Sequence, residues 1–196
     1  MPLEPQPITI ISSKVKLLNF SKVTIVVITG DASCGKSRIV ERYVNNRFTE
    51  KSHATIGVEF TTKNIVLSDG TRVRLQIWDT GILPSLLIFI NKAGTEKYRA
   101  ITTGHYRGAV GAILVYDITS EESFLNLPYW LETLRDAADE HVKIALMPNK
   151  SDIMFKKPEE REVMREQGLL FAKENNLIYV DECSALADIG IKETFS

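Results

Sequence analysis

Residues 23–29 read VTIVVIT, and residues 30–37, which follow directly, read GDASCGKS. The first stretch is a continuous run of mainly β-branched residues, which is typical of a strand buried on both faces of a parallel sheet. The second matches G-x-x-x-x-G-K-[ST], a pattern whose glycines let the backbone turn tightly, so that successive amides converge on an anion. A helix pattern over residues 36–45 brings the positive end of a helix dipole to the same point. Strand, glycine loop and helix in this order predict a phosphate-binding loop inside an α/β domain.

The chemistry of this loop assigns roles to its residues. Lys36 is expected to reach the terminal phosphates of a nucleotide, and Ser37 is expected to ligate Mg²⁺. Ser33 occupies a position that is often glycine, so a positive φ there would strain the backbone and alter nucleotide affinity or exchange. The remaining nucleotide contacts of the loop are expected at Gly30, Ser33, Cys34 and Gly35.

Outside the loop, apolar patterns typical of strands and of helices alternate along the chain. Two period-2 segments between residues 58 and 78 flank Ser68-Asp69-Gly70, a hairpin turn signal, and an irregular stretch follows over residues 79–107. The pattern predicts a three-layer α/β fold whose six-stranded sheet is mostly parallel, with one antiparallel edge hairpin. The later elements are expected as a strand at 110–116, a helix at 121–138, a strand at 142–147, a helix at 158–174, a strand at 177–180 and a helix from Ala187.

Length and composition limit the class of protein. The 196 residues suit one core, with residues 22–196 as the domain and residues 1–21 as an N-terminal extension. A formal net charge of −1 excludes an overall basic field for nucleic acid. The two cysteines, Cys34 and Cys183, are too few for a disulfide framework or a zinc site and fit a reducing compartment. The N-terminus lacks a signal-peptide pattern, and the apolar cluster at 82–90 is too short to span a bilayer, so we expect a cytoplasmic protein.

A second motif, NKSD at residues 149–152, follows the strand expected at 142–147. A carboxylate at Asp152 can accept hydrogen bonds from the N1–H and the 2-amino group of guanine, and adenine offers no such pair of donors. The motif lies where a strand ends, and ligands of open α/β sheets bind at the carboxyl ends of strands. The tripeptide Ser184-Ala185-Leu186 follows the last expected strand and is in the right order to cover the base with its backbone.

Several further stretches carry a family resemblance. They are IGVEF at 56–60, WDT at 78–80, YRAIT at 98–102, YRGA at 106–109, RGAVGAILVYDIT at 107–119 and WLETLRDAAD at 130–139. With the phosphate loop and NKSD, these stretches resemble the Ras superfamily of small GTPases and, within it, the Rab family, above all its recycling-endosome branch. The resemblance covers about residues 22–195 and implies a three-layer P-loop G domain that binds GTP or GDP with Mg²⁺.

On the phosphate side, the resemblance implies four further roles. Thr55 would ligate Mg²⁺ and sense the γ-phosphate, and Asp79 would hold Mg²⁺ through a water molecule. Gly94 would donate its N–H to the γ-phosphate. Thr95 stands where the family has a glutamine that orients the attacking water, and its side chain is too short to do the same. Catalysis would therefore rest on Lys36, Thr55, Gly94 and Thr95, with very slow intrinsic hydrolysis.

On the base side, the resemblance implies that Phe48 packs against the edge of the guanine. Asn149 and Lys150 would brace the base, with Lys150 lying along its ring, and Asp152 would specify guanine. Pro148 precedes the motif where the family usually has glycine, and it removes one backbone donor.

The segment GILPSLLIFINK at residues 81–92 separates Asp79 from Gly94, whereas the family keeps the corresponding residues close together. One interpretation is a genuine loop elaboration that adds a partner-binding surface, because longer surface loops are tolerated thermodynamically. The other is a short in-frame intron retained in the gene model, and we favour it because removal of residues 81–92 restores the family pattern without a gap. Sequencing the transcript distinguishes the two.

The sequence ends at Ser196, whereas Rab proteins normally continue into a full last helix and a tail with cysteines for prenylation. We therefore expect a truncated last helix and membrane attachment only through a lipidated tail absent from this sequence. The cytosolic face of endosomal or Golgi membranes is implied by the resemblance alone.

The predicted function is a guanine-nucleotide switch that slowly hydrolyses GTP to GDP and regulates vesicle trafficking. The resemblance implies GTP-dependent effectors, an exchange factor and a GTPase-activating protein at residues 55–60 and 93–109; a monomer without a nucleic-acid partner is expected. One alternative is a nucleotide-locked or hydrolysis-deficient interaction module, suggested by residues 81–92 and Thr95. Another is a different P-loop enzyme, such as a nucleotide kinase or an ATPase, against which NKSD argues.

Overall fold

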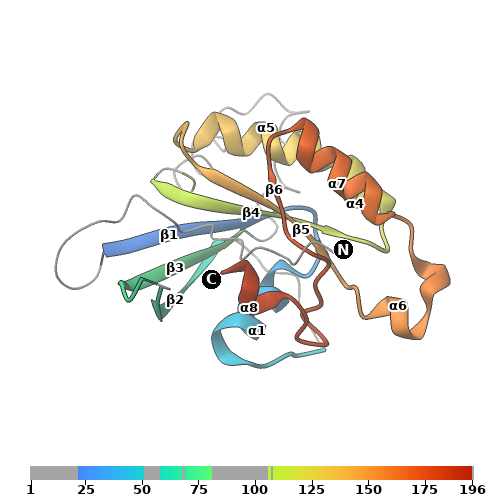
Figure 1. Cartoon of the computed structure of the whole chain (residues 1–196), viewed down its shortest axis with the longest axis horizontal. Helices are drawn as coiled ribbons and strands as arrows, with labels where there is room; N and C mark the ends of the chain where they lie inside the picture. The colour runs from blue at the N-terminus through green and yellow to red at the C-terminus, as the bar shows by residue number, and fades with distance from the viewer. Residues whose placement is uncertain (1–21, 51–57, 68, 81–105, 107, 196) are drawn as a thin grey trace.

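The computed structural model describes residues 22–50, 58–67, 69–80, 106 and 108–195 (Figure 1). Its centre is a six-stranded sheet with strand order β2-β3-β1-β4-β5-β6. β2 and β3 pair antiparallel, and every other neighbouring pair is parallel, so the predicted sheet is confirmed. The strands are β1 (Lys22–Thr29), β2 (Val58–Val66), β3 (Arg72–Thr80), β4 (Ala109–Asp117), β5 (Lys143–Asn149) and β6 (Ile178–Tyr179).

Two clusters of buried side chains cover the two faces of the sheet. The apolar residues of β4 contribute to both clusters, because successive residues of a strand point to opposite faces of the sheet. Ile113 and Val115 pack with α1 (Lys36–Asn45) and α8 (Ile191–Thr194), whereas Ala112 and Leu114 pack with the helices of the other face. Figure 1 shows α1 and α8 below the sheet and α4, α5 and α7 above it. Those three helices are α4 (Glu121–Leu125), α5 (Leu127–Ala137) and α7 (Arg165–Glu174).

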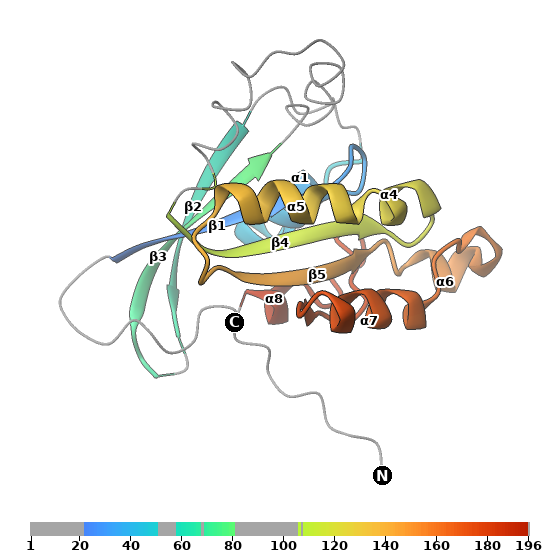
Figure 2. The ribbon, with the colours of Figure 1, turned by 90° about the horizontal axis from the view of Figure 1, so that it is seen from above.

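The single helix predicted over residues 121–138 is wrong. α4 ends at Leu125 and α5 begins at Leu127, with Asn126 between them and Pro128 in the first turn of α5. Proline has no amide hydrogen and disfavours the helical conformation of the residue before it, so it is tolerated at the start of a helix but not inside one. The two helices still run nearly in line over β4 (Figure 2).

The helix predicted over residues 158–174 is also wrong in its first half. Pro158–Glu160 forms one turn of 3₁₀ helix, and α7 begins only at Arg165. The amides of Glu162 and Val163 both donate to the Ile118 carbonyl, at 3.0 Å each, and Val163 is fully buried. This connection to the end of β4 is incompatible with a continuous helix. The short helix α6 (Ile153–Lys156), directly after NKSD, has no counterpart among the predicted elements.

Smaller differences lie at the ends of elements. Asp79 and Thr80 belong to β3 rather than to an irregular stretch, because β3 continues its pairing with β2 through both residues. The last helix begins at Ile191, after Gly190 with a φ of 68°, and not near Ala187. Among the described residues, no helix has the length and apolar character needed to cross a bilayer.

Candidate nucleotide-binding site

The predicted phosphate loop joins β1 to α1 at the carboxyl edge of the sheet. Gly30 has a φ of 137°, and a Cβ there would lie 2.1 Å from the Val115 carbonyl oxygen, so only glycine lets the loop leave β1 so close to β4. Ser33 has a φ of 64°, in the left-handed region. The strain predicted for a serine at this position is therefore present in the structure.

The side chain of Lys36 folds back over the loop. It is 6% exposed, and its Nζ donates to the carbonyl oxygens of Gly30 at 2.8 Å and Asp31 at 2.6 Å. Burial lowers the pKa of this amine, and the negative charges of Asp79 and Asp31 oppose that shift. Burial also raises the pKa of the Cys34 thiol to about 11, so this thiol adds no negative charge near neutral pH.

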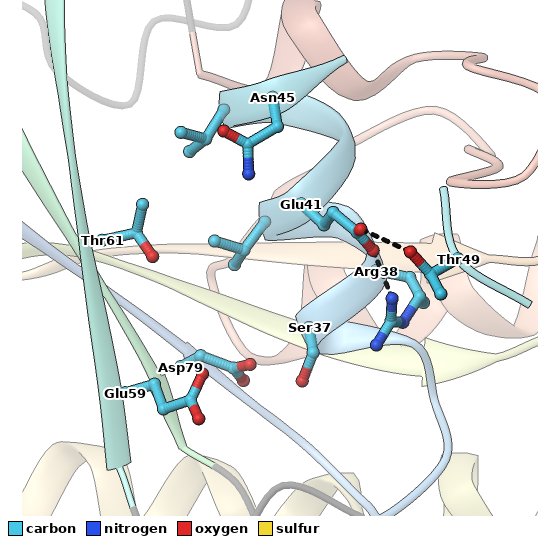
Figure 3. A pocket seen from close by; sticks show the side chains of 10 residues that line it. Ser37, Arg38, Glu41, Asn45, Thr49, Glu59, Thr61 and Asp79 are labelled. Atoms are coloured by element: carbon cyan, nitrogen blue, oxygen red, sulfur yellow. Dashed lines mark hydrogen bonds and ion pairs between the residues drawn. The ribbon is translucent and has the colours of Figure 1, made fainter. Parts of the chain in front are cut away.

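Asp79 and Ser37 line a cavity of about 380 Å³ between α1 and the β2–β3 hairpin. Figure 3 shows both side chains pointing into it. Asp79 is 4% exposed, and its Oδ1 is buried without a hydrogen-bond partner among the described residues. Burial raises the pKa of this carboxyl group, against a hydrogen bond from Ser37 and the charge of Lys36. A buried carboxylate oxygen without a partner beside a hydroxyl fits the hard oxygen ligands that Mg²⁺ prefers.

The same cavity holds a network that the sequence did not predict. Thr49 donates from Oγ1 to Glu41 Oε1 at 2.7 Å, and Glu41 also pairs with Arg38 (Figure 3). This chain of contacts ties the segment after α1 to the first turns of that helix. In the sequence, the only signal for this network was the opposite charge of Arg38 and Glu41, three residues apart in the predicted helix.

Asn149 connects the phosphate loop to the motif that was predicted to read the base. It is 2% exposed, and its Nδ2 donates to the Cys34 carbonyl at 2.7 Å. Its Oδ1 accepts from the amide of Ala185 at 3.3 Å. A Cβ on Gly35 would lie 2.3 Å from Asn149 Nδ2, so the glycine is needed for this contact. The loop at 30–37, the motif at 149–152 and the tripeptide at 184–186 therefore form one site.

The carboxylate of Asp152 is held in one orientation. Ser184 is fully buried and donates from Oγ to Asp152 Oδ1 at 2.6 Å, while the amide of Ala187 donates to Ser184 Oγ at 2.9 Å. Asp152 itself is half-buried and stands before the first turn of α6. An oriented, partly accessible carboxylate at a strand end can accept a pair of hydrogen bonds from a bound base.

Comparison with known proteins agrees with this geometry. A model of the Ras family matches residues 25–196. The chain belongs to the Ras family of small GTPases. It is 44% identical to the GTP-binding protein ypt3 of Schizosaccharomyces pombe over 86% of this chain and 71% of that protein. It is 42% identical to Ras-related protein Rab-11C of Dictyostelium discoideum over 87% and 68% of the two chains. It is 43% identical to Ras-related protein RABA4a of Arabidopsis thaliana over the same shares.

In this Ras-family GTPase, Lys150 is held by a residue that sequence reasoning missed. Lys150 has a φ of 72°, and its Nζ pairs with Asp117 Oδ2 at 2.5 Å. Asp117 Oδ1 accepts from the amide and the hydroxyl of Thr119, at 2.9 and 2.7 Å. The available signal was the place of Asp117, the last residue of a buried parallel strand, where functional side chains collect.

Arg42 is a second residue of the GTPase that was not predicted. From the last turn of α1 it donates to the carbonyl oxygens of Ala185 at 2.9 Å and Leu186 at 3.1 Å. The tripeptide at 184–186 is thereby fixed from both sides, by α1 and by Asn149.

Three predicted residues of the GTPase lie outside the described part of the chain: Thr55, Gly94 and Thr95. The segment at 81–92 lies outside it as well. Phe48 is described; it is half-buried and packs against the cluster that includes Tyr43 of α1. Its predicted contact with the guanine edge stays a prediction.

Proposed function

We propose that this GTPase is a molecular switch of vesicle trafficking that binds GDP and GTP with Mg²⁺. The observation that carries the proposal is the hydrogen bond from Asn149 Nδ2 to the Cys34 carbonyl, 2.7 Å long. It holds the end of β5, with the carboxylate proposed to read the base, against the loop proposed to hold the phosphates. One guanine nucleotide lying across the carboxyl edge of the sheet can then reach both.

Asp152 is proposed to recognise guanine through the N1–H and the 2-amino group. Ser184 donates a hydrogen bond to Oδ1 of the Asp152 carboxylate. The remaining lone pairs of Asp152 therefore have a fixed direction before a nucleotide binds. Lys150, tied to Asp117, is proposed to lie along the ring, with Phe48 at the edge of the base. The backbone at 184–186 is proposed to cover it.

On the phosphate side, Lys36 and the amides of residues 30–37 are proposed to hold the β- and γ-phosphates. Mg²⁺, when bound, neutralises charge shared by these phosphates. Ser37 and Asp79 would hold it, together with Thr55. The buried Oδ1 of Asp79 supports this assignment, because an ionised oxygen without a partner is otherwise costly.

In hydrolysis, a water oxygen forms a bond to the γ-phosphorus, and the bond from that phosphorus to the bridging oxygen breaks, so GDP leaves with that oxygen. Lys36, the loop amides and the N–H of Gly94 are proposed to stabilise the charge that develops on the phosphate oxygens. Thr95 is too short to orient the water as a glutamine would. We therefore propose slow intrinsic turnover, with an activating protein supplying the missing group.

Residues 55–60 and 93–109 are proposed to contact effectors, exchange factors and activating proteins. Phe60, within the first range, is 60% exposed and stacks on Trp78 with ring centroids 5.5 Å apart. Large exposed aromatic side chains of this kind are common anchors of protein interfaces. The trafficking role rests on the similarity to Rab-11C and related proteins.

A second candidate function is a nucleotide-locked interaction module, which Thr95 and residues 81–92 favour because both fall in the stretch that the family resemblance assigns to γ-phosphate sensing. The two candidates differ in turnover. The test is to purify the chain with and without residues 81–92, extract the bound nucleotide, and follow single-turnover GTP hydrolysis with and without an activating protein.

Bound GDP or GTP, with turnover that an activating protein accelerates, supports the switch. Bound GTP that neither chain hydrolyses, even with the activating protein, supports the locked module. Failure of both chains to bind guanine nucleotide refutes both functions.

A further inference from the structure

The proposed phosphate-binding loop itself contains a carboxylate, that of Asp31. Its carbonyl oxygen accepts from Lys36 Nζ at 2.6 Å, so its backbone lies within the loop proper. An ionised side chain turned toward bound phosphates would repel them. The structure must therefore control where this side chain points.

Two neutral donors from the α4–α5 junction hold the Asp31 carboxylate. Asn126 Nδ2 donates to Oδ2 at 2.7 Å, and Trp130 Nε1 donates to Oδ1 at 2.6 Å. Each oxygen thus has its own donor, and Trp130 is only 2% exposed. Hydrogen bonds to a charged acceptor are among the stronger ones in proteins, so this pair fixes the orientation of the side chain.

The spacing of Asn126 and Trp130 explains how both donors reach one carboxylate. Asn126 lies in the junction itself, and Trp130 lies one turn further along α5. Residues four apart face the same side of a helix, so both side chains approach the loop from the same direction. Pro128 at the start of α5 keeps the junction from closing into a continuous helix.

We propose that Asn126 and Trp130 are positioning residues for nucleotide binding: they turn the Asp31 carboxylate away from the phosphates and hold the loop carbonyl that Lys36 contacts. This inference rests on the proposed nucleotide function and deepens it. The loop is set from two sides, by Asn149 at Cys34 and by the α4–α5 junction at Asp31. Loss of either donor releases a negative charge beside the phosphate site.

The test measures the release rate of a fluorescent GDP from the full chain with Mg²⁺. Trp130→Phe keeps a large aromatic ring but removes the N–H, and Asn126→Ala removes the other donor. Each is expected to accelerate release about threefold to tenfold, the effect of losing one hydrogen bond to a charged group near the surface. The matched control is Asn175→Ala, because Asn175 caps the end of α7 as Asn126 caps the end of α4 and lies outside the site. It is expected to leave the release rate unchanged.

A double-mutant cycle with Asp31→Ala separates positioning from packing. Without the carboxylate there is no charge to control, so Trp130→Phe and Asn126→Ala are expected to have little further effect on release in that background. The preference for GDP over IDP, which reports the base side, is expected to stay the same in every variant.

Equal acceleration by both substitutions with and without Asp31, or no acceleration in either background, overturns the proposal. Thermal melts identify a variant that fails to fold, and the other donor variant then carries the cycle. If the parent chain does not bind GDP at all, the proposed function fails first, and that result is distinct from an additive cycle in a chain that binds.

Discussion

A single side chain, Asn149, holds three parts of the proposed nucleotide site together. Its amide nitrogen reaches the phosphate loop at Cys34, and its amide oxygen receives the backbone of Ala185. Gly35 completes the contact, because a Cβ there would lie 2.3 Å from the Asn149 nitrogen. The side-chain amide of Asn149 and the lack of a Cβ at Gly35 together set the distance between the proposed phosphate side and the proposed base side.

Gly35→Ala tests the close contact between the phosphate loop and Asn149. The substitution forces a Cβ against Asn149 at a φ of 93°, so we expect GDP affinity to fall by about tenfold or more, from strain of a few kcal/mol. Gly70→Ala is the matched control, because Gly70 also has a positive φ, of 82°, but a Cβ there would meet nothing within 4 Å. Equal loss of GDP affinity in both variants, measured by equilibrium titration, would contradict the role given to Gly35.

The second prediction concerns the base. Asp152→Asn replaces an acceptor by a side chain that can also donate, which suits xanthine, whose C2 carries an oxygen in place of the amine. We expect GDP affinity to fall by about 100-fold or more and that of xanthosine diphosphate to rise, since unpaired polar groups strongly disfavour the wrong ligand. Competition binding with both nucleotides measures the ratio. Unchanged GDP binding in this variant would remove Asp152 from base recognition.

At the scale of elements, the sequence predicted the parts with strong periodicity and missed those decided by tertiary contacts. α1 has the predicted bounds, Lys36–Asn45, and the β2–β3 hairpin is present as predicted, although β3 ends two residues later. The glycine loop and the turn signal at 68–70 indicate these elements in the sequence. The helix break at Asn126 was not predicted, although Pro128, in the first turn of α5, indicates it. The extended segment before α7 was not predictable locally, because it depends on the carbonyl of Ile118, the residue just after β4. Likewise, the sequence did not single out Asp117, Arg42 and Asn126, because the contacts of their side chains are with residues distant in the sequence.

Gly168→Ala tests the packing of α7 on β4. Gly168 lies inside α7, where alanine has the better helix propensity, by about 1 kcal/mol. A Cβ at Gly168 would, however, lie 2.4 Å from the Tyr116 hydroxyl and 2.9 Å from the Tyr179 ring. We expect the cost of this overpacking to exceed the gain in helix propensity. Gly168→Ala should therefore destabilise the protein by about 1–3 kcal/mol in urea denaturation. A Tyr116→Phe background removes the contact with the hydroxyl and keeps the one with the Tyr179 ring, so we expect a smaller loss of stability there. A loss as large as in the parent would refute the Tyr116 hydroxyl as the main cause.

In the whole molecule, the order of strands places side chains of the proposed site, from distant parts of the chain, along one edge of the sheet. β1 lies between β3 and β4, so the loop after it has Asp79 on one side and Asp117 on the other. The proposed metal side of this arrangement is expected to cost stability when no cation is present, because burial disfavours the ionised Asp79. The fold is therefore expected to depend on its ligands.

The corresponding prediction is that Asp79→Asn stabilises the nucleotide-free protein but abolishes the response to Mg²⁺. The folded-state pKa of Asp79 is raised, so its charge costs stability above that pKa, and asparagine removes the charge. We expect a melting temperature about 2–4 °C higher without ligand, the shift that about 1 kcal/mol produces at this chain length. The exposed Asp139→Asn is the control. A variant whose GDP complex is still stabilised by Mg²⁺ over EDTA, as the parent is, would contradict the metal assignment.

In this GTPase, one site is proposed to bind a diphosphate at Lys36 and to recognise guanine at Asp152. Competition between GDP and ADP for the full chain in Mg²⁺ tests both contacts at once. We expect tight binding of GDP and a preference over ADP on the order of 10⁴, because ADP would leave the Asp152 carboxylate without donors. Equal affinity for the two nucleotides, or no binding of either, would contradict it.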